Sequence, residues 1–202
     1  MYLAIILSDN NLAMGRYIVV TKAFLDFMLN IKFCLVTNVL WLFVLRFIVD
    51  CMLGKLTRWL RILGHDVSYY RIADDRKLID LAESEKRILL TCDIELYQQA
   101  ITQGFEADII EAPDIDGKLA ALAKRFDFKL EVDLNISRCP KCNVNLVAVS
   151  KEEIIDVIPK ATSTNYSDFW RCLGCGQKYW QGAHWKRIRL TLNSAKRRLL
   201  LL

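Results

Sequence analysis

The chain has 202 residues and a formal net charge of +5, with 53% hydrophobic and 25% charged side chains. These values indicate a globular chain that can bury a core, as one domain or as one domain with a small second one. Four of its seven cysteines form two Cys-x-x-Cys pairs, which argues against a disulfide framework and favours metal ligands.

The charges divide the chain into parts of different sign. Residues 46–138 carry 14 basic and 17 acidic side chains, whereas residues 139–202 carry 11 basic and four acidic ones. A basic module beside an acidic one is expected of a protein that binds nucleic acid. A solvated basic surface without a partner is the alternative.

The first 45 residues are apolar and show little periodicity. Their longest apolar run, residues 33–49, is interrupted by Asn38 and Arg46 and is shorter than the roughly 20 residues of a membrane span. Neither an early charged region nor a cleavage site marks a signal peptide. We expect an N-terminal extension at 1–45, loosely packed or disordered, and no membrane partner. The alternatives are a membrane anchor and a mis-annotated start, with translation beginning near Val44.

The first clear elements are a strand and a helix joined at Asp50. Residues 47–49 form a short apolar run that is typical of a buried parallel strand, and Asp50 follows directly. Apolar side chains then share one helical face up to Leu63. Basic residues recur at every third position beside that face: Lys55, Arg58 and Arg61.

Strand and helix patterns continue to alternate after this pair. Residues 67–70 form a strand pattern, Asp74 and Asp75 open a helix, and ILLTCD is a buried strand that ends at Asp93. Such alternation predicts an α/β fold with a parallel sheet and helices on both faces. The remaining segments are a helix closed by Gly104, a weaker strand at 107–111 and a helix at 116–126.

Three carboxylates are expected at one edge of this sheet, namely Asp50, Asp75 and Asp93. Ligands bind at the carboxyl ends of parallel strands, where these acids lie. Gathered carboxylates repel one another unless a cation lies between them, and Mg²⁺ or Mn²⁺ prefers such oxygen ligands. The alternative is that each acid caps a helix.

Several other chemistries are excluded or set aside. The sequence has no G-x-G-x-x-G and no G-x-x-x-x-G-K-[ST], so dinucleotide and P-loop sites are not indicated. His65 falls in a turn, where we expect it to be solvated. Cys34, Cys51 and Cys92 have apolar neighbours and are expected to be buried thiols, a usage that fits a reducing cytoplasm.

Two Cys-x-x-Cys pairs, 29 residues apart, predict a zinc ribbon. Each pair supplies two thiolates at a tight turn, and four thiolates close a tetrahedral structural Zn²⁺ site. A redox-active dithiol is the alternative. The expected ligands are Cys139, Cys142, Cys172 and Cys175.

Basic and aromatic residues interleave after the last cysteine. Aromatic rings stack on bases and cations neutralise phosphates, so this pattern favours single-stranded nucleic acid. Alternatively, the tryptophans form the core of the small module. Residues 191–202 are expected to be a fraying tail. The candidate contacts are Lys178, Trp180, His184, Trp185, Lys186 and Arg187.

Three stretches, FIVDCMLGKLTRWLRILGHD, ADDRKLIDLAESEKRILLTCD and KYWQGAHWKRI after the paired cysteines, resemble the Mut-seven C-terminal ribonuclease family. The resemblance covers about Arg46 to Ile188. It implies a PIN-like domain at 46–136, with a three-layer α/β fold, followed by a zinc ribbon at 137–190.

The resemblance also implies a metal-dependent ribonuclease that acts on RNA. Its Mg²⁺ or Mn²⁺ would be held by Asp50, Asp75 and Asp93, with Asp74 as the alternative to Asp75. PIN-type sites often add a helical glutamate, and the helix at 52–63 has no acid. Family members often have arginine where this chain has Cys92. The residues expected to hold the RNA backbone are Lys55, Arg58 and Arg61.

Two other functions fit the same residues. A non-catalytic, RNA-binding or ribosome-associated adaptor would use the ribbon and keep the acids as structural caps. A toxin-like nuclease would be silenced by a regulatory protein partner.

Overall fold

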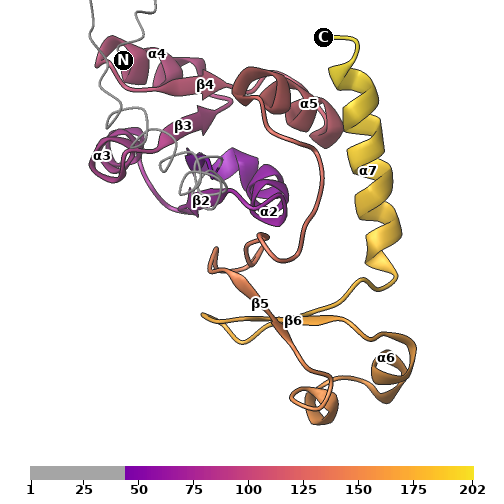
Figure 1. Cartoon of the computed structure of the whole chain (residues 1–202). Coiled ribbons are helices and arrows are strands. Elements are labelled where there is room, and N and C mark those ends of the chain that lie inside the picture. Colours follow the sequence, from indigo (N-terminus) through magenta and orange to yellow (C-terminus); the bar gives the residue numbers. More distant parts are fainter. Residues whose placement is uncertain (1–43) are drawn as a thin grey trace, which may run out of the picture. The chain divides into compact units, whose positions relative to one another are not determined.

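The computed structural model describes residues 44–202, which belong to one structural unit (Figure 1). The predictions for the extension at 1–45 therefore lie outside the described residues, except at its last two positions. None of the helices within 44–202 combines the length and apolarity that crossing a membrane requires.

A parallel four-stranded sheet forms the first half of this unit. Its strands are β1 (Arg46–Val49), β2 (Asp66–Tyr69), β3 (Ile88–Thr91) and β4 (Ala107–Ile109), in the order β2-β1-β3-β4. In β1, Phe47 pairs with Val67 on one side and with Ile88 on the other. Because the order reverses beside β1, the carboxyl ends of β1 and β3 flank the crevice where ligands bind in such sheets.

Helices cover both faces of this sheet, as predicted. Alternate residues of β1 point to opposite faces, so Phe47 and Val49 pack with α2 (Gly54–Ile62) and α5 (Ile115–Phe126). Ile48 instead packs with α3 (Asp75–Glu85) and α4 (Ile94–Thr102). A short 3-10 turn, η2 (Cys51–Leu53), connects β1 to α2.

The cysteine-bearing half forms a small antiparallel sheet of β5 (Leu146–Val149), β6 (Phe169–Cys172) and β7 (Lys178–Tyr179). Residues 150–168 form an insert between β5 and β6 that contains η3 (Ile155–Val157) and α6 (Lys160–Asn165). A local apolar cluster holds the insert in place: Ile154, Ile158, Phe169 and, partly buried, Val149, Tyr166 and Trp180.

The prediction of a fraying tail at 191–202 is wrong, because most of that segment belongs to the helix α7 (His184–Leu199). Leu192 and Ala195 are buried in the same core as α2 and α5, and Figure 1 shows α7 beside α5. The segment is too short for a core of its own, but it completes the core of the parallel-sheet half.

Candidate metal centres

The four predicted zinc ligands lie together. The Sγ atoms of Cys139, Cys142, Cys172 and Cys175 are all within 4.8 Å of one another. The Cys139–Cys175 and Cys142–Cys172 Sγ distances are 3.6 and 3.2 Å. Thiolates around a tetrahedral Zn²⁺, with Zn–S bonds of about 2.3 Å, would lie about 3.8 Å apart. The donor set therefore fits a zinc site with four cysteine ligands.

Outer hydrogen bonds support this cluster. The backbone amides of Gly174 and Cys175 point to Cys172 Sγ at 3.4 and 3.5 Å. The Tyr179 hydroxyl lies 3.0 Å from Cys139 Sγ. Burial raises the pKa of Tyr179, and its hydrogen bond to Cys139 raises it further, so the hydroxyl stays protonated. Such outer contacts orient metal ligands.

Arg61 does not face solvent, contrary to the prediction that it contacts RNA. Its guanidinium is buried and donates to the Val67 carbonyl at 3.1 and 2.7 Å. It also donates to the carbonyls of Pro140 and Lys141, inside the first Cys-x-x-Cys turn, at 3.1 and 3.3 Å. Burial lowers the pKa of Arg61, and the nearby cysteines oppose this shift. Arg61 thus joins α2, β2 and the four-cysteine cluster.

Asn143 fixes the same turn to the start of β2. Its side chain accepts from the Val67 amide at 3.0 Å and donates to Asp66 at 2.6 Å. Asp66 in turn pairs with Arg87 at 2.9 Å, and these bonds lower the pKa of Asp66 against the opposing effect of its burial. Because Asp66 begins β2, the four-cysteine cluster lies beside the amino ends of the strands.

Asp50 lies at the other edge, where β1 ends, and is 6% exposed. Its Oδ2 accepts from the Thr91 hydroxyl at 3.0 Å and its Oδ1 from the Met52 amide at 3.3 Å. Within residues 44–202, no basic side chain makes an ion pair with it. The carboxylate is therefore buried without a compensating positive charge from this part of the chain.

Asp93 follows the neighbouring strand β3 and is exposed. Its amide donates to Thr91 Oγ1 at 2.9 Å, and its Oδ1 caps α4 by accepting from the amides of Glu95 and Leu96. Thr91 is thus hydrogen-bonded to Asp50 on one side and to Asp93 on the other. Sequence reasoning missed Thr91, because a buried threonine in a strand gives no chemical signal.

Asp74 and Asp75 follow β2 and so belong to the same edge. Asp74 caps α3 by accepting from the Lys77 amide at 2.8 Å, while Asp75 is the exposed first residue of that helix. Neither joins Asp50 and Asp93 in a tight group. In the described part of the chain, only the four cysteines form a set of three or more candidate ligands within 4.8 Å.

Two further acids at this edge were missed. Asp114 and Asp116 follow β4, and Asp114 caps α5. Arg198 of α7 binds both: its two terminal nitrogens lie 2.8 and 2.9 Å from Asp114, and its Nε lies 3.2 Å from Asp116. Ser194 also donates to Asp116 at 2.6 Å. The Asp-x-Asp pattern directly after a predicted strand could have identified Asp114 and Asp116 as further acids at this edge.

The residues around Asp50 have mixed exposure. Lys55 and Arg58 are exposed on α2, as an RNA contact requires. Cys51 was expected to be buried but is exposed, and a hydrogen bond to Asp50 raises the pKa of its thiol. Cys92 is half-buried, and the Lys118 ammonium lies 3.8 Å from its sulfur.

His65 is buried rather than solvated, contrary to expectation, and is 4% exposed. Its ring lies between Phe47 and Phe128, at centroid distances of 5.8 and 4.5 Å. Neither ring nitrogen has a hydrogen-bond partner among the described residues. Burial, and secondarily the charge of Arg138, lower its pKa to about 4. This histidine is therefore neutral at pH 7.

The candidate RNA contacts near the C-terminus lie on β7 and at the start of α7. His184, Lys186 and Arg187 are exposed, whereas Lys178 and Trp185 are partly exposed. Trp180 packs on the insert cluster, as the alternative interpretation predicted, but keeps part of its surface in solvent.

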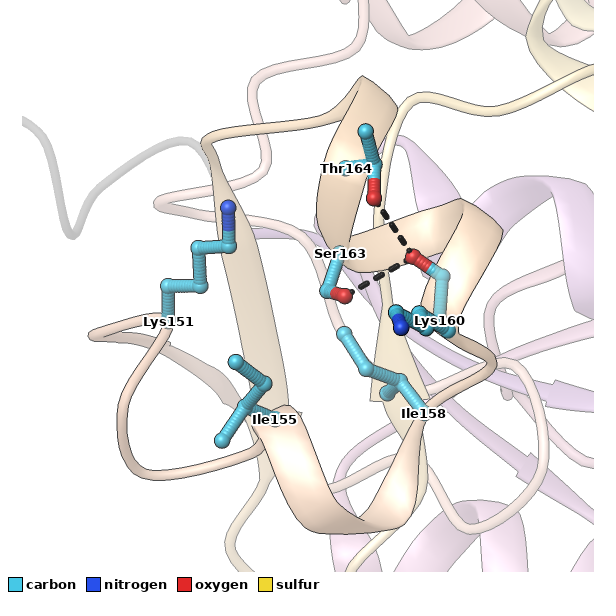
Figure 2. Close-up of a pocket in the computed structure, with 6 residues that line it drawn as sticks. All are labelled: Lys151, Ile155, Ile158, Lys160, Ser163 and Thr164. Carbon is cyan, nitrogen blue, oxygen red and sulfur yellow. Dashed lines mark hydrogen bonds between the residues drawn. The ribbon is translucent and has the colours of Figure 1, made fainter.

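The insert contains a hollow of about 460 Å³, and Figure 2 shows the side chains that line it. The hydroxyls of Ser163 and Thr164 both donate to the Lys160 carbonyl at 2.9 Å, so their protons are already used. No acid lines this hollow, and it belongs to neither metal centre. Its lining residues are Lys151, Ile155, Ile158, Lys160, Ser163 and Thr164.

Residues 45–192 match the model of the family described as Mut7-C RNAse domain. No curated protein and no solved structure matches the chain.

Proposed function

The chain belongs to the Mut7-C RNAse domain family, as its motifs predicted, and we propose that it is a metal-dependent ribonuclease acting on single-stranded RNA. Hydrolysis by an in-line water would form a bond from the water oxygen to phosphorus and break the bond to the 3′ oxygen. The products would carry a 5′-phosphate and a 3′-hydroxyl.

The observation that carries this proposal is the buried Asp50, which lacks a cationic partner in the described residues and is linked through Thr91 to Asp93. A buried carboxylate is costly unless a positive charge compensates it. The oxygen donors fit Mg²⁺ or Mn²⁺, held by Asp50 and Asp93 with Asp75 or Asp74 nearby. Such an ion would activate water and stabilise the phosphoryl oxygens.

The other residues position the substrate. Lys55 and Arg58, one and two turns along α2, would hold the RNA backbone or the charge that develops on the phosphate. The four-cysteine cluster would hold a structural Zn²⁺, with Lys178, Trp180, His184, Trp185, Lys186 and Arg187 contacting RNA. Because zinc thiolates need a reducing environment, we place the activity in the cytoplasm.

One observation favours the non-catalytic adaptor as a second candidate. The acids at the carboxyl edge do not form a group of three within 4.8 Å in the described residues. Asp74, Asp93 and Asp114 also cap helices, which is a sufficient structural role for each of them. In an adaptor, RNA would bind and leave uncut. A toxin-like nuclease, by contrast, would cut RNA only when its regulatory protein partner is removed.

The test is cleavage of end-labelled single-stranded RNA by the full chain with Mg²⁺, with Mn²⁺ and after brief chelation, while protein-bound zinc is measured. Asp50→Asn and Asp93→Asn are compared with Asp80→Asn, an exposed acid of α3. We expect metal-dependent cleavage that falls at least about 100-fold in the first two variants and is unchanged in the third. RNA binding without cleavage by the unaltered chain would support the adaptor instead.

A further inference from the structure

The helix α7 runs from the zinc ribbon to the acidic edge of the sheet. It begins five residues after Tyr179, whose hydroxyl contacts Cys139. Near its other end, Arg198 binds Asp114 and Asp116, which follow β4 at the carboxyl edge. At about 1.5 Å per residue its 16 residues span about 24 Å. The helix therefore connects two sites that lie at opposite edges of the sheet.

The charge of α7 is of one sign. Its sequence HWKRIRLTLNSAKRRL has six lysines and arginines and no acid. Lys196 and Arg198 are neutralised by ion pairs with Glu131 and with Asp114 and Asp116. The remaining cations make no ion pair with any acid in the described part of the chain: Lys186, Arg187, Arg189 and Arg197.

These cations line the outer face of the helix. Leu192 and Ala195 face the core, so the opposite face carries Lys186, Leu190 and Arg197, all exposed. Lys186 and Arg197 are 11 positions apart, or about 16 Å along the axis. Arg187 and Arg189 flank this row. The result is a basic track whose unpaired cations lie towards its two ends, with the exposed Leu190 and Asn193 between them.

We propose that the outer face of α7 is a binding track for the phosphate backbone of single-stranded RNA, leading from the zinc ribbon to the acidic edge. The track carries uncompensated positive charge, which fits a polyanion. Because the track also connects the two sites, its length fits a strand of more than a few nucleotides. Arg198 is not part of the track, because its ion pairs with Asp114 and Asp116 neutralise its charge. The inference rests on the proposed function for the identity of the nucleic acid.

Binding of a labelled RNA of about 20 nucleotides tests the track, using the full chain in an Asp50→Asn background to prevent cleavage. The variant Lys186→Gln with Arg197→Gln is compared with Lys77→Gln with Lys86→Gln, two exposed lysines in and directly after α3, on the other face of the sheet. We expect the first pair to weaken binding roughly ten-fold and to reduce the slope of log affinity against log salt by about 1.4. The control pair should change neither quantity.

A crosslinking experiment locates the RNA directly. A benzophenone amino acid replaces Leu190, which is 60% exposed on α7, or Ile101, which is 46% exposed on α4 at the other face. We expect RNA to crosslink at the first position and not at the second. A crosslink at both positions, or at Ile101 alone, would overturn the track.

The track and the proposed function can fail separately. In one outcome, the unaltered chain cleaves RNA while the Lys186→Gln, Arg197→Gln variant binds RNA with unchanged affinity. That result would overturn the track but would still support the proposed ribonuclease. Weakened binding in that variant, in a chain that never cleaves RNA, would support the track and favour the adaptor.

Discussion

The Thr91 hydroxyl donates a hydrogen bond to Oδ2 of Asp50 over 3.0 Å. The hydroxyl oxygen of Thr91 also accepts the amide proton of Asp93 at 2.9 Å, so the hydroxyl proton is directed to Asp50. Thr91 is fully buried and Asp50 nearly so, which excludes water as an easy substitute for either bond. One strand residue therefore holds both the Asp50 carboxylate and the Asp93 backbone amide.

We predict that Thr91→Val, which keeps the shape but removes the hydroxyl, leaves the buried Asp50 Oδ2 and the Asp93 amide without this hydrogen-bond partner. The free energy of unfolding should fall by about 1–3 kcal/mol. If the acids hold a metal, RNA cleavage should also fall by about 10- to 100-fold. Urea unfolding and initial cleavage rates measure the two effects. Thr91→Ser is the matched control, and a loss of the same size in both variants would exclude this role of the hydroxyl.

We predict that Arg61→Lys lowers the free energy of unfolding by about 3 kcal/mol, because lysine cannot satisfy three carbonyls from two segments of the chain. The variant should also release zinc faster to a colorimetric chelator, since the Pro140–Lys141 turn loses its support. Arg58→Lys, at an exposed position of the same helix, should stay within about 0.5 kcal/mol of the original chain. Similar losses in the two variants would count against the buried role of Arg61.

Local sequence patterns were enough to predict much of this structure. The apolar runs at 47–49 and in ILLTCD predicted the two central strands, because a strand buried on both faces needs a continuous apolar run. The cysteine spacing predicted the four-cysteine cluster, because two tight turns must supply two sulfurs each. Such signals lie within a few residues of one another and need no knowledge of tertiary contacts.

The predictions for Arg61 and His65 were wrong because contacts with residues far along the chain determine the environments of both side chains. Lys55, Arg58 and Arg61 form one basic row in the sequence, yet only Arg61 points to the carbonyls of residues 79 and 80 positions away. His65 follows a glycine in a turn and is buried by Phe128, far along the chain. Their environments depend on packing that periodicity does not encode.

We predict that His65 makes stability depend on pH in the acidic range. Its pKa is about 4 in the folded chain and 6.5 when unfolded, so between these values the unfolded chain binds the extra proton. The contribution of neutral His65 to the free energy of unfolding is complete above pH 6.5. It is lost as pH falls, by about 2 kcal/mol from pH 7 to pH 5. His65→Phe should remove this part of the loss. Urea unfolding at both pH values tests it, and an equal loss in the two chains would contradict it.

We predict that zinc removal loosens the parallel sheet at β2. The Val67 amide donates to Asn143, next to Cys142, one of the proposed zinc ligands, so loss of the metal should expose that amide. Hydrogen exchange at Val67 should accelerate on chelation or in Cys175→Ser, while the Leu89 amide, which bonds to Glu106 across the sheet, stays protected. Unchanged exchange at Val67, with zinc shown to be absent, would mean that the ribbon and the sheet are not coupled.

We predict that α7 contributes to the core of the parallel-sheet half and is not an appendage. Leu192 is 5% exposed and packs in the core shared with α5, whereas Leu190, two positions earlier, is 60% exposed. Leu192→Ala should therefore lower the free energy of unfolding by about 2–4 kcal/mol, through lost burial and a cavity, and Leu190→Ala by less than about 0.5 kcal/mol. Neither substitution weakens helix propensity, since alanine is the best helix former. A difference between the two variants in urea unfolding thus reports packing against α5, and equal small losses would mean that α7 is detached in solution.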